Sequence, residues 1–339
     1  MTDIVRAVVP LGRPPWPTLD PFLFCVHHVD KYPAGNEKLG PAASLDGRRI
    51  GMDFDNRDGW NMYHGDVVPG FPMHPHRGFE TITIVREGLI DHSDSMGAKA
   101  RFGDGDVQWM TAGGGVVHSE MFPLLDQDGP NHTEFFQIWL NLPRASKQVP
   151  PHFTMFWDRD VPKTEVVSDN GAKTTFTVVA GSVDGLEPPP PPPDSWASNA
   201  DADVAIWTLR MEPGATFELP AAASPDANRV LYFFAGDTVT VAGREVGKGN
   251  GVQLDPSAPA EIVNGSEPAA LLMLQGRPIG EPVVQHGPFV MNTQGEIRQT
   301  MLDYQRTQFG GWPFGRHDPT HGTDPQKFAV HGDGRRETP

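Results

Sequence analysis

Short apolar runs of strand length, each followed by a turn rich in glycine, aspartate or proline, recur along most of this 339-residue chain. Repeated short strands with turns at this spacing are typical of β-sandwiches and β-barrels. The sequence therefore predicts an all-β protein with two similar β domains in tandem. The first series contains FETITIV, GLIDHSD, GDVQWM and FFQIWLNL between residues 79 and 142, and the second contains TTFTVVAG, VAIWTLRM, RVLYFFAG and ALLMLQG between residues 174 and 276.

The length of the chain also favours two domains, because a domain commonly has ~150 residues. We place the boundary between residues 145 and 170, and expect domains at residues 1–158 and 159–339. Six consecutive prolines at 188–193 cannot donate to a sheet ladder, and they predict a stiff surface loop within the second domain.

One helix is expected, over residues 293–308 near the C-terminal end. Thr293 is a suitable N-cap, and Glu296 three residues later completes a capping box. Helical spacing would place Ile297, Met301 and Tyr304 on one face. The residues after Gly310 are rich in glycine, proline and polar groups, and predict either a docking strap or a frayed tail.

The charge balance excludes several classes of partner. The chain has 43 acidic and 27 basic residues, a formal net charge of −16, which repels phosphate backbones and anionic lipid surfaces.

A single cysteine, Cys25, excludes an internal disulfide framework and a multi-cysteine metal site. No apolar run approaches the ~20 residues of a spanning helix, and the first residues lack the apolar region of a signal peptide. We therefore expect no direct nucleic-acid binding, no membrane contact and a cytoplasmic location.

Histidines are concentrated in the first domain, where six of the 13 lie between residues 71 and 155. His74 and His76 are two residues apart, so on a strand both rings point to one face, with Cα atoms ~6.5–7 Å apart. His118 and Glu120 repeat this spacing after a glycine-rich bend. Two facing strands could thus present three imidazoles and a carboxylate to one ion. This ligand set suits Fe(II), and also Mn, Co, Ni, Cu or Zn.

Three segments of the chain resemble the signature segments of the pirins, which are bicupin proteins of the cupin superfamily. They are HPHRGFETITIVREG (74–88), GDVQWMTAGGGVVHSEM (105–121) and PVVQHGPFVMNT (282–293). The resemblance implies two tandem cupin (jelly-roll) barrels, with one metal in the N-terminal barrel. It also implies the same four metal ligands as the spacing: His74, His76, His118 and Glu120.

A second carboxylate competes for the fourth ligand position. The general cupin pattern takes its carboxylate from the first motif, where Glu80 follows His76. Glu80 has the same strand parity as His74 and His76, so it would face the same interior if the strand were unbroken. We favour Glu120 because it pairs directly with His118.

The resemblance implies a mononuclear iron protein, and similar proteins have quercetin 2,3-dioxygenase activity. The expected partners are then a small aromatic substrate and O2, with Glu120 and His118 as catalytic residues and Trp109 or Phe79 as aromatic walls. A second hypothesis is an iron-dependent redox sensor that binds a regulatory protein partner. A third is an isomerase that uses the metal as a Lewis acid.

The remaining histidines give weaker signals. Adjacent residues on a strand point to opposite faces, so His27 and His28 predict surface positions rather than a second site. His92 could either line the site or lie on an edge strand. The tail histidines, His317, His321 and His331, predict a solvated tail, and His286 in the third signature segment is expected to serve docking.

The second domain cannot rebuild the metal site, because residues 174–285 contain no histidine. At the position of a first metal motif, the segment TFELP (216–220) offers only Glu218. We expect this barrel to be filled by apolar and aromatic side chains.

Overall fold

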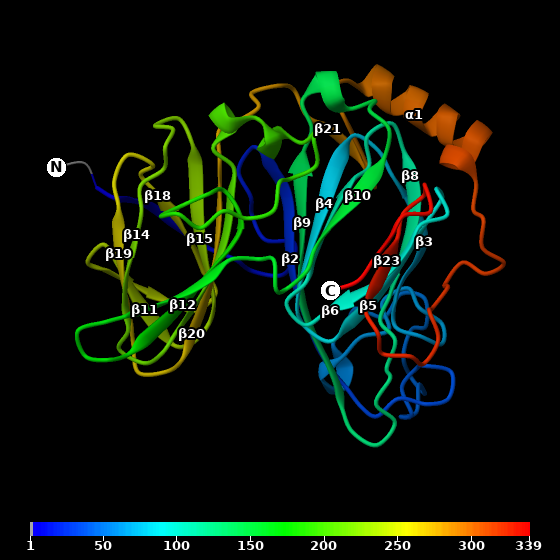
Figure 1. Ribbon diagram of the computed structural model, residues 1–339, viewed down its shortest axis with the longest axis horizontal. Coiled ribbons are helices and arrows are strands. Elements are labelled where there is room, and N and C mark those ends of the chain that lie inside the picture. Colours follow the sequence, from blue (N-terminus) through cyan, green and yellow to red (C-terminus); the bar gives the residue numbers. More distant parts are fainter. Residues whose placement is uncertain (1–2) are drawn as a thin grey trace. The chain divides into compact units, whose positions relative to one another are not determined.

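Most of the regular secondary structure of the protein is β-strand, as the sequence predicts (Figure 1). A computed structural model describes residues 3–339. Antiparallel strands form two barrel-like units, and a single α-helix lies near the C-terminal end of the described residues, before the last two strands. The expected all-β, two-cupin architecture with a C-terminal helix is confirmed.

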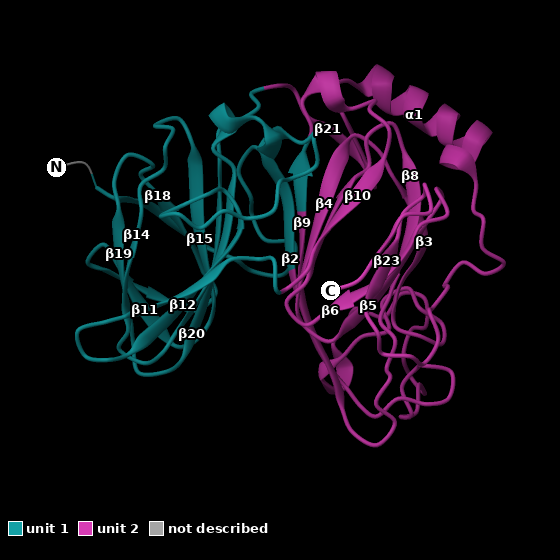
Figure 2. Ribbon diagram, viewed as in Figure 1, with its two compact units in different colours: residues 1–26, 139–141, 159–280 teal, residues 27–138, 142–158, 281–339 magenta. Residues whose placement is uncertain are grey.

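The two compact units are interleaved in sequence (Figure 2). The N-terminal segment belongs to the unit formed mainly by the second half of the chain, and the C-terminal segment belongs to the unit that carries the histidines. Strands β2 and β9 contribute residues to both units. Unit 1 contains residues 1–26, 139–141 and 159–280, and unit 2 contains residues 27–138, 142–158 and 281–339.

Unit 2 has a five-stranded sheet, a six-stranded sheet that carries both histidine motifs on its neighbouring strands β8 and β3, and a small additional hairpin. The five-stranded sheet has the order β10 (His152–Phe156), β7 (Val107–Thr111), β4 (Phe79–Glu87), β9 (Asn131–Asn141) and β2 (Phe22–Tyr32). The six-stranded sheet has the order β24 (Arg336–Glu337), β23 (Phe328–Val330), β6 (Lys99–Gly103), β5 (Leu89–Asp94), β8 (Val116–Met121) and β3 (Gly70–His76). The hairpin pairs β21 (Val284–His286) with β22 (Phe289–Met291).

Unit 1 also has two antiparallel sheets, and its interior is apolar. Its buried core includes Phe176, Trp207, Phe217, Leu231 and Leu271, as expected from the sequence. The larger sheet has the order β1 (Val5–Pro10), β18 (Asn250–Leu254), β15 (Asn228–Ala235), β20 (Ala269–Gly276), β13 (Ala205–Met211), β12 (Lys173–Ala180) and β11 (Lys163–Val167). The smaller sheet has the order β14 (Thr216–Leu219), β19 (Ala260–Asn264), β16 (Thr238–Val241) and β17 (Arg244–Gly247).

The predicted helix is α1, Gln294–Thr307, and its N-terminus has the expected capping box. The Thr293 hydroxyl accepts a hydrogen bond from the Glu296 amide at 3.2 Å. The apolar face is narrower than predicted, because Ile297 is buried whereas Met301 is 38% exposed. Short 3-10 turns occur at Arg57–Gly59, Arg144–Ser146, Trp196–Ser198, Ala200–Ala202 and Gln308–Gly310.

The C-terminal tail is a docking strap, so the prediction of a solvated tail is wrong for His321 and His331, whereas His317 is exposed. Strand β23 pairs with β6, and Ala329 is fully buried in the core of unit 2. His321 Nε2 lies 2.8 Å from the carbonyl oxygen of His92, and the ring of His331 stacks on Phe153 at 4.6 Å. Long-range strand pairing of this kind leaves no local signal in a polar tail.

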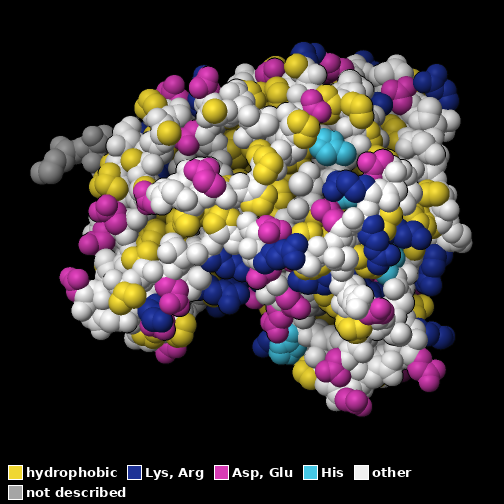
Figure 3. Space-filling view, viewed as in Figure 1, with side chains coloured by type: hydrophobic (Ala, Val, Ile, Leu, Met, Phe, Trp, Pro, Cys, Tyr) yellow, Lys and Arg dark blue, Asp and Glu magenta, His cyan; other side chains and the backbone are white. Residues whose placement is uncertain are grey.

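No helix within residues 3–339 is long and apolar enough to cross a membrane. Acidic side chains are spread over both units on the face that Figure 3 shows, in line with the net charge of −16. The surface view shows no exclusively basic face on this side of the molecule.

The ion pair between Arg101 and Asp91 fastens the strap to β6 and β5. The two side chains are fully buried and joined by two hydrogen bonds of 2.7 Å, and Arg101 also donates to the carbonyl of Gly322 at 2.8 Å. We expect Arg101→Met to lower the free energy of unfolding by about 3–5 kcal/mol, because it leaves the Asp91 carboxylate buried without its cation. Urea unfolding measures the loss. Lys173→Met, which removes an exposed pair with Glu165, is the control and should change stability little. Equal losses in the two variants would contradict this account.

Candidate metal centre

The site is built on the pairing of β3 with β8. The register places His74 opposite His118 and Phe71 opposite Glu120, with a bulge between Phe71 and His74. Residues opposite each other on an antiparallel pair share a face, so the histidines of both motifs converge. Strand β3 also contains Pro75, which is tolerated because β3 lies at the edge of its sheet.

Three imidazoles form one compact cluster in unit 2. Ring centroids are 4.4 Å apart for His74 and His118, 4.8 Å for His74 and His76, and 4.8 Å for His76 and His118. One ring nitrogen from each residue lies within 4.8 Å of the others. Nitrogen atoms at about 2.0–2.1 Å from a single ion would need only small adjustments of these positions. The structure thus brings together the three histidines that the sequence selects.

The three rings are held neutral, which is the form that binds a metal. Burial lowers the pKa of His74 to about 4 and the pKa values of His76 and His118 well below their ordinary value. His74 donates from Nδ1 to the Pro72 carbonyl at 2.9 Å, so its Nε2 keeps a lone pair. The backbone of Pro288 also forms a hydrogen bond with the His76 ring, whose buried Nδ1 has no hydrogen-bond partner among the described residues.

The ring nitrogens of His118 need a partner that a cation could provide. Both of its nitrogens are buried, and neither has a hydrogen-bond partner among the described residues. A buried polar atom without a partner is costly, and a site for a ligand or ion is one explanation for it. The donor set therefore fits a divalent transition metal.

Glu120 lies beside the cluster. Its Oε2 atom is 3.9 Å from Nε2 of His118, outside the compact group of three histidines. Gln137 donates to Oε2 at 2.9 Å, and Thr83 donates to Oε1 at 3.2 Å. Burial raises the pKa of Glu120, and these two hydrogen bonds oppose the rise.

The strand that carries His74 and His76 ends before Glu80. The sequence argument needs one strand from His74 to Glu80, but Gly78 adopts φ 87° and divides it into β3 and β4, which belong to different sheets. The condition of an unbroken strand is therefore not met. The Glu80 carboxylate accepts a hydrogen bond of 2.7 Å from the Thr111 hydroxyl on β7.

Other predicted residues take different positions. The ring of His92 is buried and 5.5 Å from that of His118, so His92 lines the cluster rather than an edge. Phe79 meets His76 edge-on at 5.0 Å, as an aromatic wall would. Trp109 instead packs against Phe156, and no ring contact joins it to the histidines within residues 3–339.

Sequence reasoning missed an aromatic group on the other side of His74. Phe71 contacts His74 at 6.3 Å, Tyr63 at 5.0 Å and His28 at 5.9 Å, all between ring centroids. The prediction that His27 and His28 lie at the surface is also wrong, because both are partly buried. Phe71 precedes the first histidine motif by three residues, but the bulge that turns it to the same face has no signal in the sequence.

The fold and the histidine cluster define the protein as a bicupin with a candidate metal centre in one barrel. The family model described as pirin matches residues 17–140, and the model described as the pirin C-terminal cupin domain matches residues 206–310. The chain belongs to the pirin family.

Individual relatives agree with this classification. A pirin-like protein of Caulobacter vibrioides is 35% identical over 256 residues, which cover 74% of this chain and 84% of the relative. A pirin-like protein of tomato, Solanum lycopersicum, is 35% identical and covers 70% of this chain and 75% of its own length. Among solved structures, a quercetin 2,3-dioxygenase from Acinetobacter baumannii superposes with a TM-score of 0.67 at 25% identity, covering 91% of this chain and 96% of that protein.

The cluster generates a prediction about metal and stability. A divalent ion such as Co(II) at 100 times its Kd should raise the free energy of unfolding by about 2.7 kcal/mol, because it binds the folded state alone. Urea unfolding with and without a chelator measures the difference. His118→Ala should abolish the gain, and His132→Ala, whose side chain is 46% exposed, should retain it. An equal gain in both variants would contradict a site at the cluster.

Proposed function

We propose that this pirin is a metal-dependent dioxygenase that cleaves flavonol-like aromatic substrates with O2, in the manner of a quercetin 2,3-dioxygenase. The observation that carries the proposal is the cluster of three imidazoles, two buried and one partly buried, on paired strands of one barrel. The similarity to the Acinetobacter baumannii quercetin 2,3-dioxygenase supports the choice of substrate class.

In this proposal His74, His76, His118 and Glu120 hold a single divalent ion, with Fe(II) as the first choice and Mn, Co, Ni, Cu or Zn as alternatives. When bound, the ion supplies Lewis acidity toward substrate oxygen atoms and, as iron, the capacity for one-electron chemistry with O2. The carbonyls of Pro72 and Pro288 fix the orientation of two of the ligand rings.

The side chains of the barrel have separate tasks. Glu120 takes the proton of a substrate hydroxyl group, since burial raises its pKa toward the range of a useful base. Gln137 and Thr83 hold the carboxylate in place through their hydrogen bonds. Phe71 and Phe79, which contact His74 and His76, provide flat apolar surfaces for a planar substrate.

Oxygen consumption tests the activity directly. Purified protein loaded with Fe(II) and mixed with quercetin should consume O2 in proportion to the quercetin lost. His118→Ala should reduce the rate at least ~100-fold because it removes a central ligand, and His132→Ala should keep it. An oxygen electrode together with quercetin absorbance gives both quantities.

Failure has a defined meaning in this experiment. If protein that holds its metal consumes no O2 with quercetin, the dioxygenase proposal is rejected. A redox-dependent complex with a protein partner would then support the sensor hypothesis, and turnover without O2 consumption would support an isomerase.

The carboxylate ligand can be identified by exchanging each candidate. Glu120→Gln should weaken metal binding by about 10- to 100-fold, because it removes a charged ligand or a group next to His118. Glu80→Gln keeps the size and the partner Thr111, and should change the affinity less than about threefold. Competition with a chelating dye measures both constants. The reverse ranking would transfer the ligand role to Glu80.

A further inference from the structure

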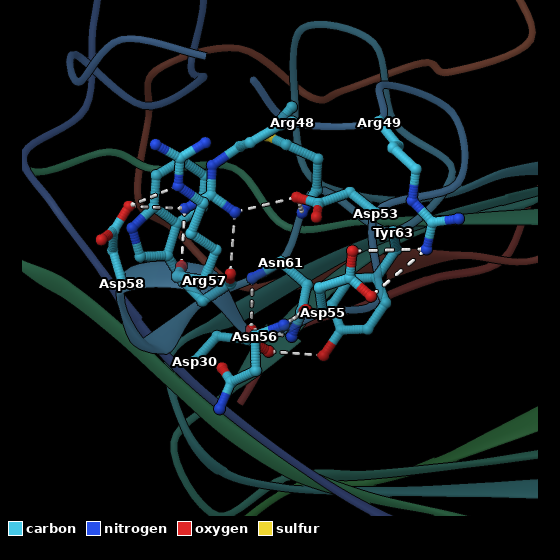
Figure 4. A network of polar contacts seen from close by, with 12 residues as sticks. Asp30, Arg48, Arg49, Asp53, Asp55, Asn56, Arg57, Asp58, Asn61 and Tyr63 are labelled. Atoms are coloured by element: carbon cyan, nitrogen blue, oxygen red, sulfur yellow. Dashed lines mark hydrogen bonds and ion pairs between the residues drawn. The ribbon is translucent and has the colours of Figure 1, made fainter. Parts of the chain in front are cut away.

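A chain of hydrogen bonds lies beyond Phe71, outside the metal cluster. Tyr63 donates its hydroxyl to Oδ2 of Asp30 at 2.6 Å, and Nδ1 of His28 lies 2.9 Å from the same hydroxyl oxygen. Asn61 donates to Oδ1 of Asp30 from its backbone and side-chain nitrogens, at 2.8 and 2.9 Å. Figure 4 shows Asn61 and Tyr63 converging on Asp30.

The protons in this chain have one consistent arrangement. A distance of 2.6 Å is typical of a hydroxyl that donates to a carboxylate. Because the Tyr63 hydrogen points to Asp30, the Tyr63 oxygen accepts from Nδ1–H of His28. Nε2 of His28 then carries the lone pair, and it has no hydrogen-bond partner among residues 3–339. The imidazole is only partly buried, so this nitrogen is not sealed in the core.

Polar contacts within the loop before Tyr63 hold the hydrogen-bonded residues in position (Figure 4). The Arg48 guanidinium lies 3.3 Å from the centre of the Trp60 ring, and it donates to Asp53 at 2.9 Å and to the Trp60 carbonyl at 3.0 Å. Asp53 in turn accepts from the amide of Met62 at 2.9 Å.

Tyr63 itself has φ 56°, a left-handed conformation that is unfavourable for an aromatic residue. Such backbone strain persists only where the surroundings enforce it, and it is concentrated at functional sites. The strained backbone is therefore an observation independent of the hydrogen bonds, and it points to the same residue.

Phe71 connects this chain to the metal cluster. The centroid of the Phe71 ring lies 5.9 Å from that of His28 and 6.3 Å from that of His74, and both contacts are edge-on. A multi-ring aromatic molecule lying against Phe71 would thus have one end near the cluster and the other near His28. This placement rests on the proposed function, which supplies the aromatic substrate.

We propose that His28, Tyr63 and Asp30 form a proton relay that ionises a phenolic or enolic hydroxyl group at the end of the bound aromatic substrate near His28. This is a different hydroxyl group from the one that Glu120 deprotonates. The substrate O–H bond breaks and its proton goes to Nε2 of His28. Nδ1 of His28 passes its proton to the Tyr63 oxygen, and Tyr63 passes its own proton to Asp30. The products are a substrate oxyanion and a neutral Asp30 carboxylic acid, with no change in total charge and no oxidation or reduction.

The pKa values of His28 and Asp30 favour transfer of the proton to Asp30 over its retention on His28. Burial raises the pKa of Asp30 to about 6, with a further contribution from nearby Asp53, so this carboxylate is a better proton acceptor than an ordinary aspartate. Burial and the neighbouring His27 lower the pKa of His28 to about 3. His28 is therefore suited to pass a proton on, and Asp30 is suited to keep it.

The test uses quercetin and chelator-treated, metal-free protein, at a pH where free quercetin is neutral. The absorbance of the bound molecule distinguishes its neutral form from its anion. Wild-type protein should bind quercetin as the anion, and Tyr63→Phe and His28→Gln should lower the bound anion fraction about tenfold. In iron-loaded protein, the same variants should lower kcat about 100-fold with little change in KM or metal content. His132→Gln is the matched control, because the His132 side chain is 46% exposed and lies beside Glu87 rather than beside a residue of the relay.

The outcomes separate the relay from the dioxygenase activity. Failure of quercetin to bind, binding in the neutral form, or an unchanged anion fraction in folded Tyr63→Phe and His28→Gln would overturn the relay. His28→Gln retains a polar, partly exposed side chain, so it remains informative if Tyr63→Phe does not fold. Anion formation that depends on the relay, without O2 consumption after iron loading, would support the relay and reject the dioxygenase. O2 consumption that requires His118 but not His28 or Tyr63 would support the dioxygenase and overturn the relay.

Discussion

Ring nitrogens of three imidazoles can lie within 4.8 Å of one another only if none of the rings is charged. This constraint governs the barrel of unit 2 that contains His74, His76 and His118. Burial supplies the condition, because it lowers the pKa values of His74, His76 and His118. Burial alone would leave the ring orientations free. The carbonyls of Pro72 and Pro288 fix two of the rings. The site is thus a product of desolvation and of backbone acceptors at specific positions.

The role of Pro288 explains why a C-terminal segment of unit 2 accompanies a site made by its N-terminal strands. Arg77, next to His76, donates to the Gly114 carbonyl at 2.6 Å and to the Asp303 carboxylate on α1 at 2.9 Å. Lys147 donates to the carbonyl of Gly78 at 2.7 Å. These bonds fasten the turn after His76 to the helix and to the glycine-rich bend before β8. The helix therefore stabilises the site without providing a ligand.

The sequence predicted those parts of the site that depend on local spacing. Two i, i+2 pairs identified His74, His76, His118 and Glu120, and the structure brings the three histidines together with Glu120 beside them, because strand geometry alone sets this spacing. The helix was predictable for the same reason, since capping by Thr293 is a local interaction.

Features that depend on distant contacts were not predictable. The break at Gly78 assigns Glu80 to another sheet, and no local pattern distinguishes it from a continuous strand. His28 becomes part of a polar chain only because a loop more than 30 residues later returns Tyr63 to it. His321 and His331 are partly buried where the tail packs on unit 2, and the pairing of β23 with β6 joins segments that are far apart in sequence.

Burying the polar groups of the histidine site costs free energy, and only one of the two barrels contains such a site. Unit 2 buries His92, Glu120, Gln137 and Thr83 in the same barrel as the cluster, and each polar atom removed from water needs a partner to be tolerated. Unit 1 contains no histidine, and at the corresponding strand Glu218 faces solvent. Its main core is a large apolar cluster, which gains about 25 cal/mol per Å² of buried surface, and polar side chains such as Arg229 and Asn264 are buried outside this cluster. Because the polar contacts that hold the histidine site are confined to unit 2, unit 1 can keep this apolar cluster without any loss to the chemistry.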